Sequence, residues 1–159
     1  MGKSNFERMI QMAEEVFDTK SDPNQLDITQ EVLEGLAKIH PATRSEFSDE
    51  NGPAVWILII PTTAELMNQF IAGKISEQEL YERTKSVSVF ESIYLCSAMV
   101  LDEYRGKGIA KRMTMEMINS IRNDHPIQSL FVWPFSEKGD KLAEVIARES
   151  KLPLLKRLH

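Results

Sequence analysis

Hydrophobic positions along the chain follow two periods, and these divide it into helices and strands. Between residues 5 and 18, apolar side chains recur every three or four positions with charged residues between them, which predicts an amphipathic helix facing a core. Residues 55–60 and 93–101 are instead continuous apolar runs, which predict strands, the first of them buried on both faces. The same patterns predict helices over residues 27–40, 64–72, 76–84, 109–124 and 138–150, and strands over residues 87–91, 127–133 and 154–158.

Short polar side chains mark where several helices begin. Ser4 and Glu7 form a capping-box pattern, in which a hydroxyl and a carboxylate satisfy the free N–H groups of the first turn reciprocally. Asp27 is a candidate N-cap of the second helix, and Thr62 or Thr63 of the third.

Glycine and proline bound the first apolar strand. Residues 43–51 are polar, and Asn51-Gly52 is a strong turn signal. Because Pro53 has no N–H group for a ladder, we expect the strand to begin beyond it, and we expect Pro61 to end it.

Composition places the chain among ordinary globular proteins. Its 159 residues fit one domain over residues 1–159, with 42% hydrophobic and 27% charged side chains. A net charge of −5 argues against a nucleic-acid surface. No apolar run approaches the ~20 residues of a membrane span, and the start lacks a signal peptide's apolar run. We therefore expect a cytoplasmic protein without a membrane or nucleic-acid partner.

The residues that could hold a metal are few. Cys96 is the single cysteine, which excludes an intrachain disulfide and a cysteine-based zinc site. The three histidines have no metal-ligand spacing, so no metal is expected.

The clearest chemical motif is a strand, a glycine-rich turn and a helix. The apolar run 93–101 leads into Asp102-Glu103-Tyr104 and then into residues 105–108, Arg-Gly-Lys-Gly, before the helical pattern starts. Such a turn presents unpaired N–H groups at the start of a helix, and glycine lets the backbone adopt positive φ and approach a ligand. Successive N–H groups make an anion nest. The sequence therefore predicts a bound phosphate or pyrophosphate.

Two common phosphate motifs do not fit this turn. The P-loop pattern G-x-x-x-x-G-K-[ST] is absent, and a dinucleotide fingerprint fails because Lys111 stands where its third glycine belongs. Residues 105–110, Arg-Gly-Lys-Gly-Ile-Ala, instead fit the signature [RQ]-x-x-G-x-[GA]. With the strand before it and the helix after it, this stretch resembles the acyl-CoA site of the GNAT family of N-acetyltransferases. The resemblance is strongest over residues 93–151.

The resemblance implies an α/β (α+β) fold, with a mixed, mostly antiparallel central sheet flanked by helices and splayed at the strand 93–101. Acetyl-CoA would be the acyl donor, with its pantetheine in that gap and its pyrophosphate on the turn. The residues that the resemblance assigns to CoA binding are Met99, Val100, Leu101, Arg105, Gly106, Lys107, Gly108, Ile109, Ala110 and Lys111.

The implied reaction is direct transfer of an acyl group, usually acetyl, to an amine. The N–H near Val100 would stabilise the oxyanion. Many family members carry a base eleven residues before the motif's first position, where this chain has Tyr94, a poor base at neutral pH. Glu91 could act instead through water, and Asp102 and Glu103 are alternatives.

Other features depart from the family or remain open. Ala147 stands where a general-acid Tyr is common, and Asp140 replaces a common Asn. The helical insert 64–84 is either a packing element or a wall of the acceptor site. Cys96, in mid-strand, is expected to be a packed small residue rather than an acyl-enzyme nucleophile. The acceptor side could be completed by a second subunit in a homodimer, by the N-terminal helices, or not at all.

Two competing functions follow from the same residues. The missing acid and the neutral Tyr94 also suit a domain that binds acyl-CoA without catalysis, as a sensor or interaction module. A phosphoprotein or nucleotide-binding module unrelated to CoA is the third hypothesis.

Overall fold

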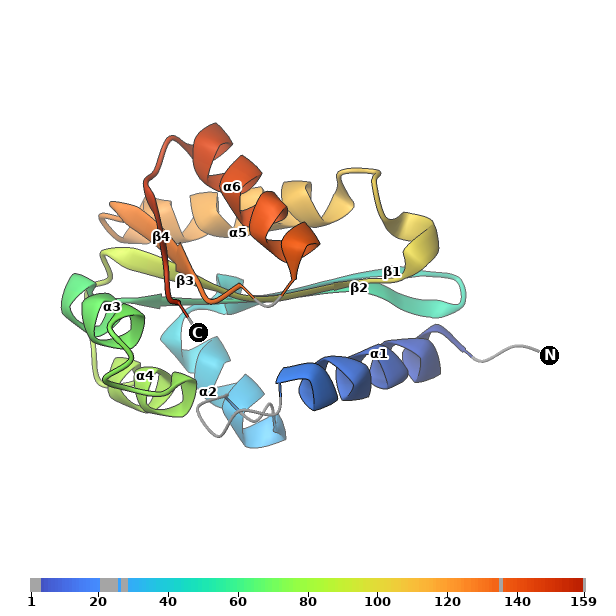
Figure 1. Ribbon diagram of the computed structural model, residues 1–159, viewed down its shortest axis with the longest axis horizontal. Coiled ribbons are helices and arrows are strands. Elements are labelled where there is room, and N and C mark those ends of the chain that lie inside the picture. Colours follow the sequence, from blue (N-terminus) through green and yellow to red (C-terminus); the bar gives the residue numbers. More distant parts are fainter. Residues whose placement is uncertain (1–3, 21–25, 27–28, 135, 159) are drawn as a thin grey trace.

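The computed structural model describes residues 4–20, 26, 29–134 and 136–158. Within these residues, five strands form one sheet in the order β1-β2-β3-β4-β5, with helices on both faces (Figure 1). The strands are β1 (Arg44–Asp49), β2 (Gly52–Thr62), β3 (Ser92–Val100), β4 (Ser129–Val132) and β5 (Leu154–Lys156). The α-helices are α1 (Asn5–Lys20), α2 (Gln30–Ile39), α3 (Ala64–Ile71), α4 (Glu77–Thr84), α5 (Ile109–Asp124) and α6 (Glu137–Ser150).

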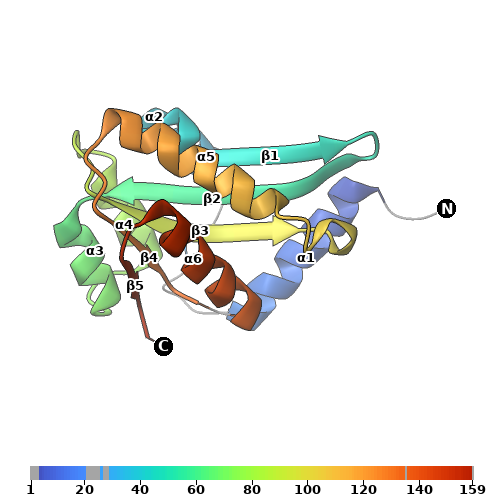
Figure 2. The ribbon, with the colours of Figure 1, turned by 90° about the horizontal axis from the view of Figure 1, so that it is seen from above.

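The sheet is mixed, as expected for an α+β fold. β1, β2 and β3 pair antiparallel over most of their length. β4 and β5 join in parallel, each over three residues, and their crossovers are α5 and α6. β3 pairs with β4 only from Ser92 to Tyr94 and then runs on without a strand on that side (Figure 2). The mixed sheet agrees with the expected α+β fold, while the expected splay at β3 stays a prediction.

Two apolar clusters fill the space on the two faces of the sheet. α5 and α6 cover one face and bury Ile93, Ile118 and Ile121. On the opposite face, Phe70 of α3 and Tyr94 belong to the second cluster, together with residues of α2 and α4. Neighbouring residues of β3 point to opposite faces, which is why Ile93 and Tyr94 lie in different clusters.

Hydrogen bonds at the helix starts agree in part with the predicted caps. Thr63 Oγ1 accepts the N–H of Leu66 at 3.1 Å, so the third helix begins where expected. Ser4 Oγ accepts the N–H of Glu7, but the Glu7 carboxylate meets the Ser4 hydroxyl rather than its main chain. The proposed cap Asp27 lies outside the described residues; α2 is capped by Thr29.

The region around Asn51-Gly52 differs from the prediction. Residues 44–49, predicted only as polar, form β1, whose side chains alternate between exposed and half-buried. β2 includes both prolines, because Pro53 lies at an irregular pairing opposite Ser48 and Pro61 lies beyond the end of β1. Neither position needs an N–H group for pairing with β1.

The predicted strand over residues 87–91 was wrong. This segment forms no regular element, and β3 begins at Ser92. Its apolar residues serve as a connection instead: Phe90 is buried against the ring of His125, and Val89 is exposed. β4 and β5 are also shorter than the predicted strands 127–133 and 154–158.

Candidate functional site

The glycine-rich turn lies between β3 and α5, after a short 3₁₀ turn over Asp102–Tyr104. Gly106 has φ 76° and Gly108 has φ 77°, a backbone region that other residues rarely adopt. A Cβ at either glycine would have no atom within 4 Å, so backbone conformation and not space selects glycine here. Gly108 is the N-cap of α5 and supplies no side-chain cap, which leaves the N–H groups of the first turn unsatisfied.

The amides from Gly106 to Lys111 face no acceptor within the described part of the protein. The first bonded amide of this stretch is that of Arg112, which donates to Gly108 O at 3.0 Å. The turn itself is exposed, and Ile109 and Ala110 are half-buried. A continuous run of free donors at the positive end of a sixteen-residue helix favours an anion.

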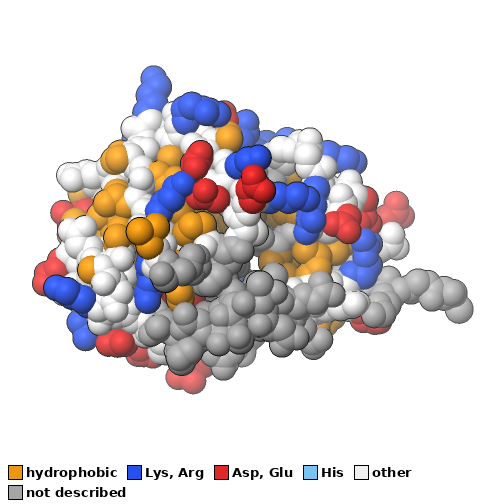
Figure 3. Space-filling model, in the orientation of Figure 1, with side chains coloured by type: hydrophobic (Ala, Val, Ile, Leu, Met, Phe, Trp, Pro, Cys, Tyr) orange, Lys and Arg blue, Asp and Glu red, His pale blue; other side chains and the backbone are white. Residues whose placement is uncertain are grey.

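The basic side chains of the turn are partly engaged. Lys111 Nζ lies 2.9 Å from the Glu149 carboxylate of α6. Arg105 holds the turn closed, because its Nε donates to Val100 O at 3.2 Å and its Nη1 pairs with Asp102 at 3.0 Å. In Figure 3, Lys and Arg side chains lie along the upper rim of the molecule, over α5 and α6, with acidic side chains among them.

Beyond Tyr94, the free edge of β3 has main-chain groups available to a ligand. Leu101 N–H donates to Ala54 O of β2 at 2.9 Å. Since alternate residues of a strand direct their N–H and C=O groups to opposite sides, those of Val100 and Ala98 face the open edge, where Arg105 Nε already occupies Val100 O. Ser97 and Ala98 are exposed there. Of the predicted residues Met99, Val100 and Leu101, Val100 is thus the one whose N–H faces the open edge of β3.

Contacts from the N-terminal half fix the turn that precedes the glycines. Arg8 of α1 makes a two-pronged contact with Glu103, at 2.5 and 2.6 Å. This hydrogen-bonded ion pair lowers the pKa of Glu103 from its usual 4.5 to about 2. Asp102 and Glu103, the alternative bases, are therefore both held in ion pairs with arginine.

A second contact joins the turn to the β1–β2 hairpin. The Tyr104 hydroxyl donates to Asp49, which raises the pKa of Tyr104 and lowers that of Asp49. Asn5 Nδ2 also donates to Asp49, at 2.8 Å, and to Gly52 O at 3.2 Å. α1, the hairpin and the turn are thereby one hydrogen-bonded unit.

The two candidate catalytic residues have separate partners. Glu91 is half-buried, and its Oε1 accepts the N–H of Ala64 at the start of α3 at 3.3 Å. Tyr94 is 1% exposed, and its hydroxyl donates to Glu77 at 2.5 Å. Burial, with the nearby Glu77 carboxylate, raises the pKa of Tyr94 well above its usual value, so this hydroxyl is a hydrogen-bond donor and not a proton acceptor at neutral pH.

Glu77 is the residue that sequence reasoning missed. It is 2% exposed on α4, where Leu80, Tyr81 and Thr84 share its buried face. Its sequence context, Ser-Glu-Gln-Glu, is typical of an ordinary helix start, and Ser76 and Glu79 do form a capping box. The available signal was spacing, because a carboxylate at the i position of an i, i+3, i+4, i+7 apolar face is unusual.

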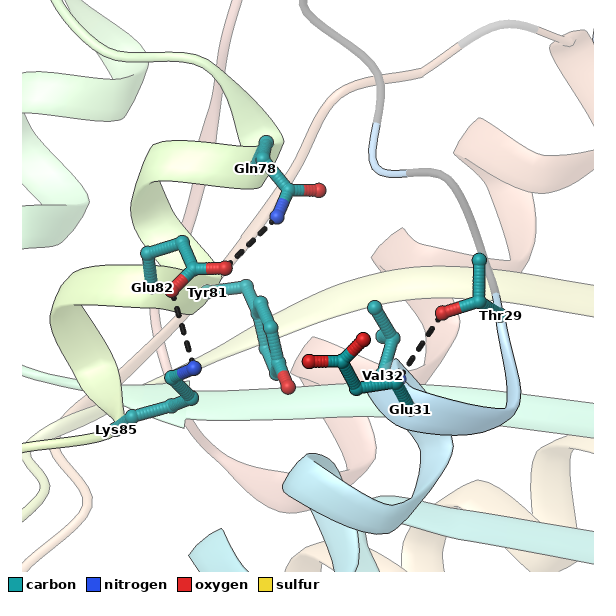
Figure 4. Close-up of a pocket in the computed structure, with 7 residues that line it drawn as sticks. All are labelled: Thr29, Glu31, Val32, Gln78, Tyr81, Glu82 and Lys85. Carbon is teal, nitrogen blue, oxygen red and sulfur yellow. Dashed lines mark hydrogen bonds and ion pairs between the residues drawn. The ribbon is translucent and has the colours of Figure 1, made fainter.

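A separate hollow of about 230 Å³ lies between α2 and α4 (Figure 4). Its lining includes Tyr81, Glu31 and Glu82, and on the α4 side Lys85 pairs with Glu82 at 3.1 Å. None of the predicted site residues lines this hollow.

No protein-family model matches the chain, and a comparison with curated proteins found no match. In the described residues, no group of three or more His, Cys, Asp or Glu side chains is placed to hold a metal ion. Among the same residues, no helix has the length and apolar character needed to cross a membrane.

Proposed function

We propose that this protein is a GNAT-like N-acyltransferase of the cytoplasm that transfers an acetyl or other acyl group from CoA to an amine. The observation that carries the proposal is the run of unbonded amides from Gly106 to Lys111 beside the open edge of β3. A CoA thioester combines a diphosphate with a long pantetheine arm that bonds to main chain. The glycine-rich turn suits the diphosphate, and the open edge of β3 suits the pantetheine arm.

The turn suits a diphosphate for three physical reasons. Its free N–H groups converge on the helix start. Gly106 and Gly108, at φ 76° and 77°, adopt the left-handed conformation from which a nest of N–H groups is built. Lys107 and Arg112, both exposed on the same turn, add positive charge.

The transfer step needs few protein groups once both substrates are held together. The amine nitrogen attacks the thioester carbonyl, the C–S bond breaks, and CoA leaves as a thiolate. The Val100 N–H on the open edge is placed to stabilise the oxyanion. The proton lost by the amine goes to bulk water, because Glu91 precedes β3 and lies nine residues from Val100, about 30 Å along an extended strand. Ala147 is 5% exposed and supplies no acid, so the thiolate leaves without protonation by this residue.

Calorimetry with CoA and acetyl-CoA tests the binding step. We expect saturable one-to-one binding that pantetheine, which lacks the diphosphate, does not reproduce. Release of free CoA from acetyl-CoA across a panel of small amines, polyamines and peptides then tests transfer. Failure of CoA to bind, with another nucleotide binding in its place, would contradict the assignment in favour of a nucleotide module.

A second function is favoured by the surroundings of Glu91 and Tyr94. Glu91 accepts the N–H of Ala64 at the start of α3, and Tyr94 is buried against Glu77. Neither side chain therefore lies free at the open edge of β3. An acyl-CoA-binding sensor without catalysis would need only the glycine-rich turn and the open edge of β3. Tight CoA binding with no turnover on any amine would support this alternative.

A further inference from the structure

Glu77 is a buried carboxylate that the transfer step above does not use. Its Oε1 accepts the N–H of Leu26 at 2.8 Å, and its Oε2 accepts the hydroxyl of Tyr94 at 2.5 Å. The thiol of Cys96 lies 4.0 Å from the same Oε2. Because a carboxylate removed from water is costly unless donors surround it, these three donors account for its burial.

Two of these donors, Tyr94 and Cys96, lie at an irregularity in β3. Leu58 of β2 pairs with Ser97, and the next residue, Ile59, pairs with Leu95, so Cys96 is the extra residue of a β-bulge. A bulge changes the direction in which the following residues aim their main-chain groups. This bulge therefore determines which amides of β3 face the open edge.

The position of the bulge coincides with the start of the open edge. Tyr94 is the last residue of β3 that pairs with β4, and Cys96 follows two positions later. Arg157, buried after β5, is the other charged group that acts on Tyr94; it stacks on Phe70 and donates to Ile75 O at 3.1 Å. Glu77 therefore accepts hydrogen bonds from the residues of β3 at which the open edge begins.

We propose that Glu77 is a positioning residue of the transfer site, which through Tyr94 and Cys96 fixes the β3 bulge and hence the direction of the Val100 amide. This inference rests on the proposed function. It also gives the helical insert over residues 64–84 a task, because α4 carries the carboxylate to the sheet. Glu77 acts through its two partners on β3 and need not touch either substrate.

Glu77→Gln tests the proposal with little change of shape. An amide has a single acceptor oxygen, so it cannot serve both Leu26 N–H and the Tyr94 hydroxyl in the same way. With the best amine of the panel, we expect kcat to fall about tenfold or more, since small misplacements at a reacting centre are costly. The Kd for CoA should rise by much less than kcat falls, because the diphosphate turn contacts neither Glu77 nor the bulge and only the pantetheine contacts with β3 are affected.

Thr84→Val is the matched control on the same helix. Thr84 is also fully buried on α4, and its Oγ1 bonds Thr62 Oγ1 and Leu80 O, each at 2.7 Å. We expect this variant to lose stability while its kcat stays at the wild-type value. The control therefore separates a general loss of α4 stability from loss of the Glu77 contacts with the bulge.

A second measurement needs no substrate. Cys96 is the single thiol, so alkylation by iodoacetamide reports on the bulge alone. In Glu77→Gln, the pH of half-maximal alkylation should fall, because removal of a neighbouring carboxylate favours the thiolate. Thr84→Val should leave this profile unchanged. If Glu77→Gln does not fold, Tyr94→Phe takes its place, with a fall in kcat much larger than the rise in Kd expected.

The outcomes separate this inference from the proposed function. Wild-type protein that binds no CoA overturns the proposed function, and with it the role given to Glu77. Wild-type protein that binds and turns over acetyl-CoA, with Glu77→Gln equal to it in kcat and thiol profile, overturns the inference alone. Equal losses of kcat and CoA affinity in Glu77→Gln and Thr84→Val also overturn it, because they indicate a purely structural role.

Discussion

At the residue scale, glycines meet two opposite requirements in this protein. Gly108 has φ 77° and open space around it, so its lack of a Cβ serves the backbone conformation. At Gly35, inside α2, limited space rather than backbone conformation requires glycine. A Cβ there would lie 1.9 Å from the hydroxyl oxygen of Tyr81, so glycine serves the packing of its neighbour. The two positions therefore predict different consequences of substitution.

Gly108→Asp should weaken CoA binding severely. The substitution adds backbone strain of about 1–3 kcal/mol in the left-handed region, and it adds a negative charge at the anion nest. We expect the Kd measured by calorimetry to rise at least about tenfold. Gly73→Asp is the control, because Gly73 has φ 76° and equally open surroundings at the end of α3. Equal Kd values for Gly108→Asp and wild type would contradict the site assignment.

Gly35→Ala should destabilise the protein although helix propensity favours alanine by about 1 kcal/mol. The overlap with the Tyr81 hydroxyl must be relieved by movement, at a cost of about 1–3 kcal/mol. Urea unfolding of wild type, Gly35→Ala, Tyr81→Phe and the double variant measures this. We expect alanine to destabilise the protein that retains Tyr81 and to be tolerated when Tyr81→Phe is also present. Destabilisation of equal size in both cases would show that the hydroxyl is not the cause.

At the element scale, α1 acts as a brace for the turn rather than only as a cover for the sheet. Arg8 reaches Glu103 just before the glycines, and Asn5 reaches Asp49 on the hairpin. The amides of a nest bind an anion best when they are already in place, because ordering them costs conformational entropy. Under the proposed function, α1 would thus hold the turn in place for the anion.

Acid should release this brace in a defined pH range. The folded-state pKa of Glu103 is about 2, below its usual 4.5, so its pairing stabilises the fold above about pH 4.5 and is lost as the pH falls toward 2. The difference in Tm between wild type and Arg8→Gln should therefore be largest near neutral pH and shrink on acidification. Arg83→Gln, which removes an i, i+4 pair with Glu79 within α4, is the control. A Tm difference that is constant down to pH 2 would show that Glu103 is not the partner.

The sequence allowed most helices to be predicted and fewer of the strands. The helices over 64–72, 76–84 and 138–150 have strong periodicity and local caps, so their own residues carry the signal. β1 was missed because a single apolar side chain, Phe47, lies among polar ones; it is a strand because β2 pairs with it. Residues 87–91 have the composition of a strand but are not paired as one; at their end, the Glu91 N–H donates to Thr62 O of β2 at 2.9 Å.

The candidate site likewise has one part that could be predicted from the sequence and one part that could not. The glycine turn was found because its conformation is encoded by adjacent residues. Glu77 was not, because its partners Leu26, Tyr94 and Cys96 come from other parts of the chain and meet it only in the folded protein. Local chemistry can be predicted from one sequence, whereas a buried contact between distant segments requires the fold.

At the scale of the whole molecule, ligand binding and stability should be linked. The turn is tied to α1 and to the β1–β2 hairpin, so a ligand on its amides acts on a unit that spans both halves of the chain. At one hundred times Kd, CoA should add about 2.7 kcal/mol to the free energy of unfolding. For a protein of this size that raises Tm by about 5–10 °C, which differential scanning fluorimetry measures. Pantetheine at the same concentration is the comparison, and an equal rise with it would place binding elsewhere.

The unpaired stretch of β3 beyond Tyr94 has one more consequence, for handling the purified protein. Unpaired edge strands can pair with extended segments of neighbouring molecules. This edge has few charged side chains that would oppose such pairing. A coenzyme lying along that margin would act as a shield. Concentrated samples should consequently stay clear for longer with CoA present than without it, as followed by light scattering over days.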